Sequence, residues 1–319
     1  MVPDVKIYGT ESKSQHKLRF AAIDIGTNAA RLLLTNVYFE NGHPIFKKVG
    51  LYRIPLQLGD DVFSIGAISN KKSEKLRHTM HAFSHLLQIF NPVASMACAT
   101  SAMRESANGQ ELANQILLDT GIQIQIIDGK RESELICTNH LFRQFPAANY
   151  LYIDVGGGST EIAHFDHHVL TMAESFKIGT LRLLNQWVEP DEWNKAKAFI
   201  RRAITDGSPT IAIGTGGNIS KALSLTHSKS SKPVPLETIQ KLHHKLESMP
   251  LRDRIINLNL KPDRAEVIVP ALEIYVRCMK WAKINAIYIP KVGLSDGMIQ
   301  YLFHNHVAHH PIPFETAGA

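Results

Sequence analysis

The chain has 319 residues, which is long enough for two domains with substantial cores. Apolar residues make up 44% and charged residues 20% of it, as in a soluble globular protein, and the absence of any run of eighteen apolar residues predicts no membrane span. The formal charge of +6 favours a polyanionic partner, but we expect no specific nucleic acid partner because zinc-finger spacing, an RNP-type aromatic motif and a basic zipper are all missing.

Hydrophobic periodicity predicts an α/β protein that begins with three antiparallel strands. These strands are expected at 18–24, 31–40 and 44–56, with an Asn41-Gly42 turn between the last two. Further strands are expected at 93–99, 122–127, 150–154, 162–165, 169–176, 210–213 and 286–289. Helices are expected at 71–90, 111–119, 130–145, 179–187, 190–205, 236–247, 251–257 and 263–281, with a final helix beginning at 295–297.

Three segments predict irregular structure. Residues 1–17 are polar without an apolar stretch, which indicates a disordered leader and not a signal peptide. Residues 226–235 are rich in Ser, Lys and Pro and indicate a linker or mobile loop. A flexible polar terminus is expected for the last histidines, with a metal cluster as the alternative; they are His304, His306, His309 and His310.

The cysteines bear on the cellular compartment. Cys98, Cys137 and Cys278 are far apart in the sequence and form no C-x-x-C motif. Such isolated cysteines in odd number predict a reducing cytoplasm, with neither a zinc site nor a disulfide framework.

Two of the expected strands end in an aspartate that is followed by small residues. In FAAIDIGTNAARLLL, Asp24 precedes Gly26, Thr27 and Asn28; in YLYIDVGGGSTEI, Asp154 precedes Gly156, Gly157, Gly158, Ser159 and Thr160. Glycines let successive backbone N–H groups converge on an anion, the hydroxyls add donors, and Asp154 is placed to hold a cation beside that anion. The repeat predicts two related halves that share one cleft. The alternative is two ordinary hairpin turns.

A third glycine-rich turn follows the strand expected at 210–213. It contains Gly214, Gly216 and Gly217 and leads into a helix. Such a turn could lie under a nucleotide or the next phosphate of a chain, although close strand–helix packing alone can also require glycine. None of the three loops has the spacing of a Walker A or Rossmann motif.

Two charged residues near strand ends are candidates for catalysis. Arg104 follows the strand at 93–99, where a helix begins, and its planar fork suits phosphate oxygens; the alternative is a surface salt bridge. Glu132 follows Asp128-Gly129 in the first turn of a helix, where a carboxylate often serves only the helix dipole. Its position between the two repeated halves would also suit a general base for water.

The sequence resembles the exopolyphosphatase / guanosine pentaphosphate phosphohydrolase (Ppx/GppA) family of the actin-like ATPase superfamily. The segments that carry the resemblance are AIDIGTNAARLLL, ATSAMRESAN, IDGKRESE, YIDVGGGSTEI, the turn at 177–180, AIGTGGNIS and GLSDGM. They occur in the family's order and cover about residues 18–303. The chain is similar to the short, two-domain members.

The resemblance implies a role for each matching residue. It places Asp24, Gly26, Thr27, Asn28 and Arg31 in a first phosphate motif, and Asp154, Gly156, Gly157, Gly158, Ser159 and Glu161 in a second. It implies that Glu132 is the catalytic base and that Arg104 contacts substrate phosphates. Mg²⁺ or Mn²⁺ is the expected cofactor, with Asp154, Asp24 and Glu132 as candidate ligands. Ala29 stands where the family commonly has serine, and Ser133 where alanine is common.

The implied fold is α/β, with two actin-like (ribonuclease H-like) domains whose mixed five-stranded sheets are flanked by helices. The expected domains are 1–129 and 130–319, although the last helix could pack back on the first domain. The active site would lie in the cleft between them, and the resemblance also makes a homodimer the expected assembly.

The implied activity is hydrolysis of the terminal phosphoanhydride of inorganic polyphosphate or guanosine pentaphosphate, between which the sequence does not choose. Two alternatives stay open. One is a kinase or ATPase of the same superfamily, with residues 214–218 holding an adenosine. The other is a regulator that binds polyphosphate or an alarmone without catalysis.

Overall fold

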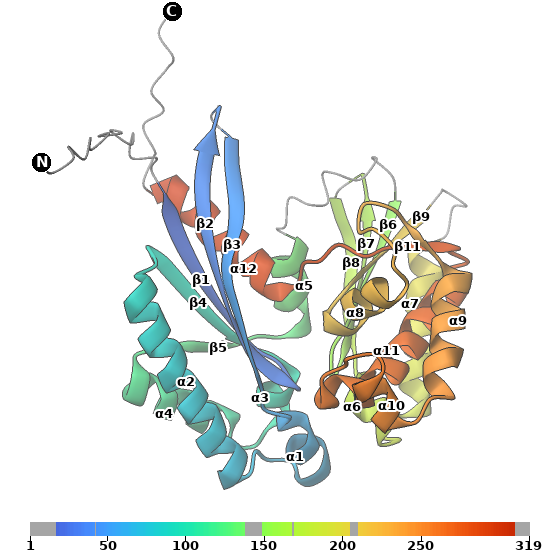
Figure 1. Cartoon of the computed structure of the whole chain (residues 1–319), viewed down its shortest axis with the longest axis horizontal. Helices are drawn as coiled ribbons and strands as arrows, with labels where there is room; N and C mark the ends of the chain where they lie inside the picture. The colour runs from blue at the N-terminus through green and yellow to red at the C-terminus, as the bar shows by residue number, and fades with distance from the viewer. Residues whose placement is uncertain (1–16, 42, 138–148, 168, 205–209, 310–319) are drawn as a thin grey trace, which may run out of the picture.

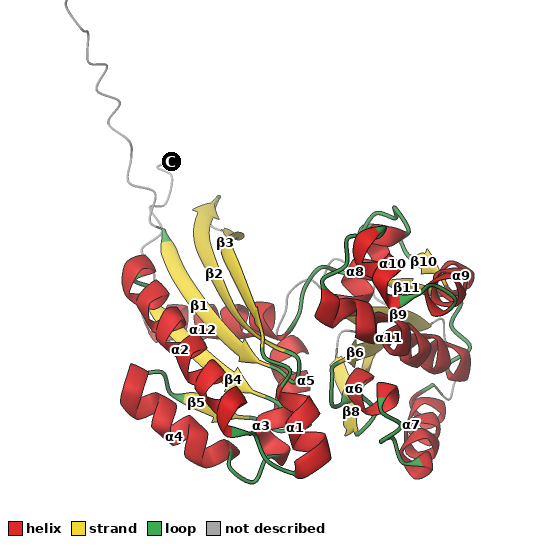
Figure 2. Ribbon diagram, turned by 60° about the horizontal axis from the view of Figure 1, so that its bottom comes forward, coloured by secondary structure: helices red, strands yellow, loops and turns green. Residues whose placement is uncertain are grey.

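Each of the two lobes of the molecule is built around a mixed β-sheet with helices on both faces (Figures 1 and 2). The structure is a computed structural model, and it describes residues 17–41, 43–137, 149–167, 169–204 and 210–309. None of the helices in these ranges combines the length and the apolar composition that a membrane crossing requires.

The two sheets share one topology. The first has the order β3-β2-β1-β4-β5; its strands are β1 (Leu18–Ile25), β2 (Ala29–Glu40), β3 (His43–Pro55), β4 (Ala94–Ala99) and β5 (Ile124–Ile126). The second repeats this order as β8-β7-β6-β9-β11; its strands are β6 (Asn149–Val155), β7 (Thr160–Asp166), β8 (Val169–Phe176), β9 (Thr210–Thr215) and β11 (Ala286–Tyr288). In both sheets the first three strands are antiparallel and the last two run parallel to the first.

The helices of the first lobe are α1 (Leu58–Ile65), α2 (Asn70–Phe90), α3 (Ser101–Glu105) and α4 (Gly109–Thr120). The next helix, α5 (Gly129–Cys137), packs against α12 and against β7 and β8 of the second sheet. The helices of the second lobe are α6 (Thr180–Leu184), α7 (Pro190–Ala203), α8 (Gly217–Leu225), α9 (Leu236–Glu247), α10 (Leu251–Ile256) and α11 (Pro262–Trp281). The last helix, α12 (Leu294–His309), returns to the first lobe, where it packs against β1, β2, β4 and α5 (Figure 1).

The central strands are apolar along nearly their whole length because both of their faces are buried. In β1, Ala21, Ile23 and Ile25 pack in the core under α2 and α4. The alternate residues Phe20 and Ala22 belong to a central cluster that contains residues of α5 and α12 and also reaches the second sheet. Alternate residues of β1 point to opposite faces of the sheet, and both faces are buried, so the sequence of β1 shows no polar face.

Phe303 anchors α12 on the first sheet. Its ring contacts Phe20 and Phe46 edge-on, at centroid distances of 6.1 and 5.2 Å. The expectation that the last helix packs back on the first lobe agrees with this contact. The residue at which one domain ends and the next begins stays a prediction.

Several sequence expectations need correction. The second sheet carries a sixth strand, β10 (Val234–Pro235), because the segment predicted as a loop at 226–235 ends in a pairing with β11. The helix expected after β4 is two helices, α3 and α4, since Ser106 is extended. The helix α1 was not predicted. His304 and His306 lie in α12 and not in a flexible terminus, and the described residues give no metal-binding group there.

Some expectations fall outside the described residues. These are the leader up to residue 16, Gly42 of the first hairpin turn, the helix beyond Cys137, His168, the end of the helix predicted up to 205, and His310.

We expect Gly297→Ala to destabilise the protein. A Cβ on Gly297 would lie 2.0 Å from the Leu135 carbonyl oxygen, so α12 would have to move away from α5. Alanine favours a helix over glycine by about 1 kcal/mol, but overpacking of this kind costs about 1–3 kcal/mol, so the free energy of unfolding should fall. Urea unfolding measures the change. Gly293→Ala is the control, since its Cβ would have no neighbour within 4 Å, and equal stability of the two variants would contradict the tight contact.

Candidate functional site

The same backbone hydrogen bond closes both aspartate-containing loops. Gly26 N donates to the Ala29 carbonyl at 3.1 Å, and Gly156 N donates to the Ser159 carbonyl at 2.9 Å. In strand register, Asp24 lies opposite Arg31, and Asp154 lies opposite Glu161. The two loops are therefore equivalent turns of the repeated sheet, as the sequence predicts.

Helix N-termini orient the peptides of these loops. Gly59 N at the start of α1 donates to the Thr27 carbonyl at 3.1 Å, and Thr180 N at the start of α6 donates to the Gly156 carbonyl at 3.0 Å. In a trans peptide the N–H points away from the carbonyl. The N–H groups of Asn28 and Gly157 are therefore turned the other way, and in the described part of the chain they donate to no protein acceptor. Such groups can bind an anion.

The two loops touch each other, and glycine is required where they meet. A Cβ on Gly157 would lie 2.8 Å from Thr27 Cβ, which is closer than side chains approach. A Cβ on Gly158 would lie 2.6 Å from Ser101 Oγ, and the Ser101 hydroxyl is hydrogen-bonded to the Thr27 hydroxyl at 2.8 Å. The loops thus form one continuous wall.

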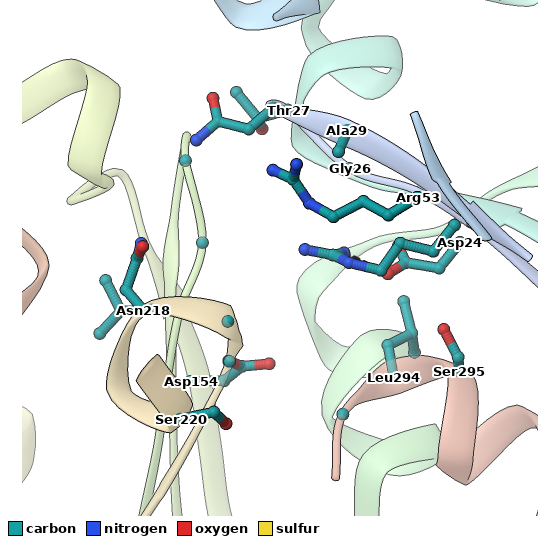
Figure 3. Close-up of a pocket in the computed structure, with 18 of the residues that line it drawn as sticks. Asp24, Gly26, Thr27, Ala29, Arg53, Asp154, Asn218, Ser220, Leu294 and Ser295 are labelled. Atoms are coloured by element: carbon teal, nitrogen blue, oxygen red, sulfur yellow. Dashed lines mark hydrogen bonds and ion pairs between the residues drawn. The ribbon is translucent and has the colours of Figure 1, made fainter. Parts of the chain in front are cut away.

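This wall borders a cleft of about 450 Å³ between the lobes. Figure 3 shows Thr27 and Asp24 on one side, Asp154, Asn218 and Ser220 on the other, and Leu294 and Ser295 of α12 below. The predicted residues that line the cleft are Asp24, Gly26, Thr27, Asn28, Arg31, Glu132, Asp154, Gly156, Gly157, Ser159, Gly216 and Gly217.

Four carboxylates lie close together at the closed end of the cleft. Burial raises the pKa of the Glu132 carboxyl well above its usual range, and the charges of Glu161, Asp154 and Asp24 raise it further. Burial and Glu161 likewise raise the pKa of Asp154 to about 7, although the Thr215 hydroxyl opposes this. The pKa values are high because several negative charges share a space that excludes water.

These carboxylates fit a divalent cation. Asp154 and Glu132 both line the cleft, and Glu132 Oε2 is buried without a hydrogen-bond partner among the described residues. Oxygen ligands are those that Mg²⁺ prefers, and a positive charge here would relieve the mutual repulsion. Asp24 fits less well, because its Oδ2 already accepts from Arg31 Nη1 at 2.6 Å. Asp154 and Glu132 could therefore hold the metal, with Asp24 beside them.

Three guanidinium groups also converge on the cleft, and one of them, that of Arg31, pairs with Asp24. Arg31 and Arg53 are register partners on β2 and β3, and Arg53 extends into the cleft, where it forms an ion pair with Asp263 of α11 (Figure 3). A Cβ on Gly217 would lie 3.0 Å from Arg264 Nη2 and 3.9 Å from Arg31 Nη2. Burial lowers the pKa of Arg264, and the charges of Arg53 and Arg31 lower it further. We call Arg31, Arg53 and Arg264 the arginine cluster; it favours a bound polyanion.

Five predicted residues are not among those that line the cleft, and their assignment as phosphate contacts stays a prediction. The Thr160 hydroxyl donates to the Ile178 carbonyl, and the Glu161 carboxylate accepts from Ser159 and Ser175 Oγ at 2.6 and 2.8 Å. Gly158 is buried in the contact between the loops.

Gly214 and Arg104 are the other two. Gly214 is a packing glycine, since a Cβ there would lie 2.7 Å from Ile287 Cδ1. Arg104 Nη1 donates to the Ile127 carbonyl at 2.8 Å, and its charge lowers the pKa of Glu132 and Glu161. Arg104 therefore supports the segment before α5 in this structure.

Sequence analysis missed Arg53 and Arg264. A regular hairpin about residues 41–42 would place Tyr52 opposite Arg31, but a register shift between Leu34 and Thr35 places Arg53 there instead. Arg264 lies in α11, more than 200 positions along the chain from the first loop, so only the tertiary fold relates it to that loop.

Arg264→Gln should weaken the binding of tripolyphosphate about tenfold or more, because a charge-assisted hydrogen bond contributes about 1.5–3 kcal/mol. The increase in melting temperature on titration with tripolyphosphate, in EDTA, measures the affinity. Arg277→Gln is the control on the same helix, since its guanidinium is 46% exposed and pairs with Glu273 at 2.6 Å. If both variants bind as the wild type does, Arg264 is not part of an anion site.

In EDTA, the free energy of unfolding should fall as the pH rises from about 4 to above 7. The Asp154 carboxyl keeps its proton to about pH 7 in the folded protein but ionises near pH 4 in the unfolded chain. Because the folded state binds more protons in this window, its stability is highest at the acid end and is lost as the pH rises. Asp154→Asn should flatten the dependence, measured by urea unfolding, whereas the exposed Asp191→Asn should leave it unchanged. An unaltered slope in Asp154→Asn would contradict the raised pKa.

Comparison with known proteins places this fold and cleft in a family. The family model described as the Ppx/GppA phosphatase family matches residues 39–306. The chain is 25% identical over 303 residues to exopolyphosphatase 1 of Mycobacterium bovis, covering 88% of this chain and 87% of that protein. It is 24% identical over 307 residues to a putative exopolyphosphatase of Haemophilus influenzae, covering 91% and 92%.

Solved structures agree in fold. A crystal structure of an exopolyphosphatase from Cytophaga hutchinsonii superposes with a TM-score of 0.76 at 23% identity, covering 90% of this chain and 98% of that one. The Aquifex aeolicus member of the Ppx/GppA family gives a TM-score of 0.73 at 19% identity, covering 91% and 99%. Both lobes thus have the actin-like fold, and the chain belongs to the Ppx/GppA phosphatase family.

Proposed function

We propose that the protein hydrolyses the terminal phosphoanhydride of inorganic polyphosphate. Similar proteins named exopolyphosphatases, matched over most of both chains, support this substrate. The observation that carries the proposal is the buried Glu132 Oε2, which has no hydrogen-bond partner among the described residues; Glu132 lines the same cleft as the two loops and the arginine cluster. Cleavage of a phosphate chain by water requires a base, a binding site for the terminal phosphate and a binding site for the rest of the polyanion.

The terminal phosphate would sit at the wall formed by the two loops. The N–H groups of Asn28 and Gly157 would donate to its oxygens, and these donors are fixed before the substrate arrives. The arginine cluster would bind the following phosphates, since guanidinium groups pair with phosphate oxygens in a bidentate manner. Remote binding of this kind holds the chain in place for reaction at its end.

Glu132 would orient and deprotonate the attacking water. Its raised pKa makes its carboxylate a stronger base than an exposed glutamate. Asp154, with Glu132 and Asp24 nearby, would hold Mg²⁺ or Mn²⁺, which supplies positive charge against the phosphate oxygens when bound. We assign the metal chiefly to Asp154 because Asp24 is already paired with Arg31.

Guanosine pentaphosphate is the second candidate substrate. The residues that line the cleft also include Ser220, Lys221, Ser224 and Val267 on α8 and α11. Polar and apolar groups together at the end of a phosphate site suit a nucleoside. The homodimer and the cytoplasmic location that the resemblance implies stay predictions.

Glu132→Gln should lower Mg²⁺-dependent phosphate release about 10²- to 10⁴-fold without unfolding the protein, because the amide cannot accept the proton of water. Phosphate release from long-chain polyphosphate and from guanosine pentaphosphate is measured in parallel. Glu134→Gln is the control two residues further along α5; its carboxylate pairs with Arg131 at 3.2 Å and is 40% exposed. Full activity of Glu132→Gln would remove Glu132 from the mechanism. Binding of both compounds by the wild type without release would favour a regulator instead of a hydrolase.

A further inference from the structure

Arg182 of α6 is a buried cation outside the cleft with partners in three different elements. The residue is 9% exposed, and its Nε donates to the Gly158 carbonyl at 2.8 Å. Its Nη2 forms an ion pair with Glu105 of α3, and its guanidinium lies 4.0 Å from the centre of the Phe63 ring of α1. Arg182 therefore connects the second loop to two helices of the other lobe.

These contacts complete the orientation of the second loop. Thr180 N and Leu181 N donate to the carbonyls of Gly156 and Gly157 at 3.0 and 2.9 Å, and Arg182 supplies the donor for the next carbonyl, that of Gly158. Three consecutive carbonyls are thus held by α6. Because N–H groups point opposite to these carbonyls, Arg182 fixes the direction of the Ser159 N–H, and Ser159 lines the cleft.

Through Glu105, Arg182 is also linked to the segment that carries Glu132. Glu105 is the neighbour of Arg104 in α3, and Arg104 Nη1 donates to the Ile127 carbonyl at 2.8 Å. The next residue, Asp128, immediately precedes α5: its carboxylate accepts from Arg131 N at 2.7 Å, and its carbonyl accepts from Glu132 N at 2.9 Å. Hydrogen bonds of Arg182, Arg104 and Asp128, joined by the covalent steps Arg104–Glu105 and Ile127–Asp128, therefore connect the second loop to the proposed base.

We propose that Arg182 is a positioning residue that fixes the second anion-binding loop relative to Glu132. The inference rests on the proposed function, since it assigns Arg182 a part in the same reaction without contact to substrate. Glu105 is its necessary partner, because a buried charge without its counter-charge is strongly unfavourable. Phe63 holds the plane of the guanidinium, which a lysine at this position could not reproduce.

The first test compares Arg182→Lys, Glu105→Gln and the double variant in Mg²⁺-dependent polyphosphate hydrolysis. A displaced loop should lower kcat about 10²-fold while KM changes less than about threefold, because misplacement of about 1 Å affects the reaction more than binding. The double variant should be no worse than the poorer single variant. Arg77→Lys is the control, since Arg77 pairs with Asp119 at 2.7 Å between α2 and α4, away from the cleft.

Three outcomes would overturn the proposal: kcat unchanged in folded Arg182→Lys with only a lower melting temperature, KM raised with kcat unchanged, or losses that add in the double variant. The first would mean a merely structural role, the second a substrate contact, and the third no coupling through Glu105. If Arg182→Lys does not fold, Phe63→Leu is measured instead, with the same expectation and a smaller loss.

A second measurement does not depend on activity. Hydrogen exchange of the Gly156 amide, which donates to the Ser159 carbonyl at 2.9 Å, should become at least tenfold faster in Arg182→Lys and remain as in the wild type in Arg77→Lys. If the wild type releases no phosphate but the exchange increases as expected, the proposed function fails while the role of Arg182 in fixing the loop stands. Unchanged exchange overturns the inference about Arg182 whatever the activity of the wild type.

Discussion

The contact between the two loops is the constraint on which the rest of the site depends. Gly157 meets Thr27 and Gly158 meets Ser101 at separations that leave no room for a Cβ. Because the loops touch, the N–H groups of both lobes can face one anion, and the cleft has a closed end at which Glu132 can be buried. The helices behind the loops, α1 and α6, donate backbone hydrogen bonds to the loop carbonyls, which point away from the cleft. Glycine here is required by the meeting of two lobes, which explains why the motif is richer in glycine in one half than in the other.

The repeated sheets differ in charge at the residues paired with the two aspartates. Across β1, β2 and β3 the paired residues are Asp24, Arg31 and Arg53, whereas across β6, β7 and β8 they are Asp154, Glu161 and Ser175. In the first sheet Arg31 neutralises the aspartate, and Arg53 pairs with Asp263 of α11. In the second sheet, burial and the charge of Glu161 raise the pKa of Asp154 to about 7. One fold used twice thus carries arginines beside one aspartate and a further acid beside the other, which is the basis for the proposed polyanion and cation sites.

Much of the fold and of the candidate site could be predicted from the sequence, because the patterns that indicate them lie in short segments of the chain. Strand-end aspartates, adjacent glycines and apolar runs indicated the loops and most of the elements, and Glu132 was placed correctly at the start of its helix. The remainder depended on tertiary packing. Gly214 and Gly216 look alike in the sequence, yet one packs against Ile287 and the other lines the cleft. The arginine cluster joins β2, β3 and α11, and no short-range pattern relates Arg264 to Arg31.

The register shift in β3 limits how this strand can vary in length. The residues of β3 before and after the shift pair with β2 in registers that differ by one residue. Arg53 reaches the cleft only because of the extra residue, Val49. A one-residue slip moves every side chain to the opposite face of a sheet. An equivalent irregularity occurs in β8, between the pairs of His164 and Phe165, before Ser175. A homologue that lacks one residue here would keep its hairpin but turn its arginine away from the cleft, so a single gap in an alignment at this point separates chains with different anion sites.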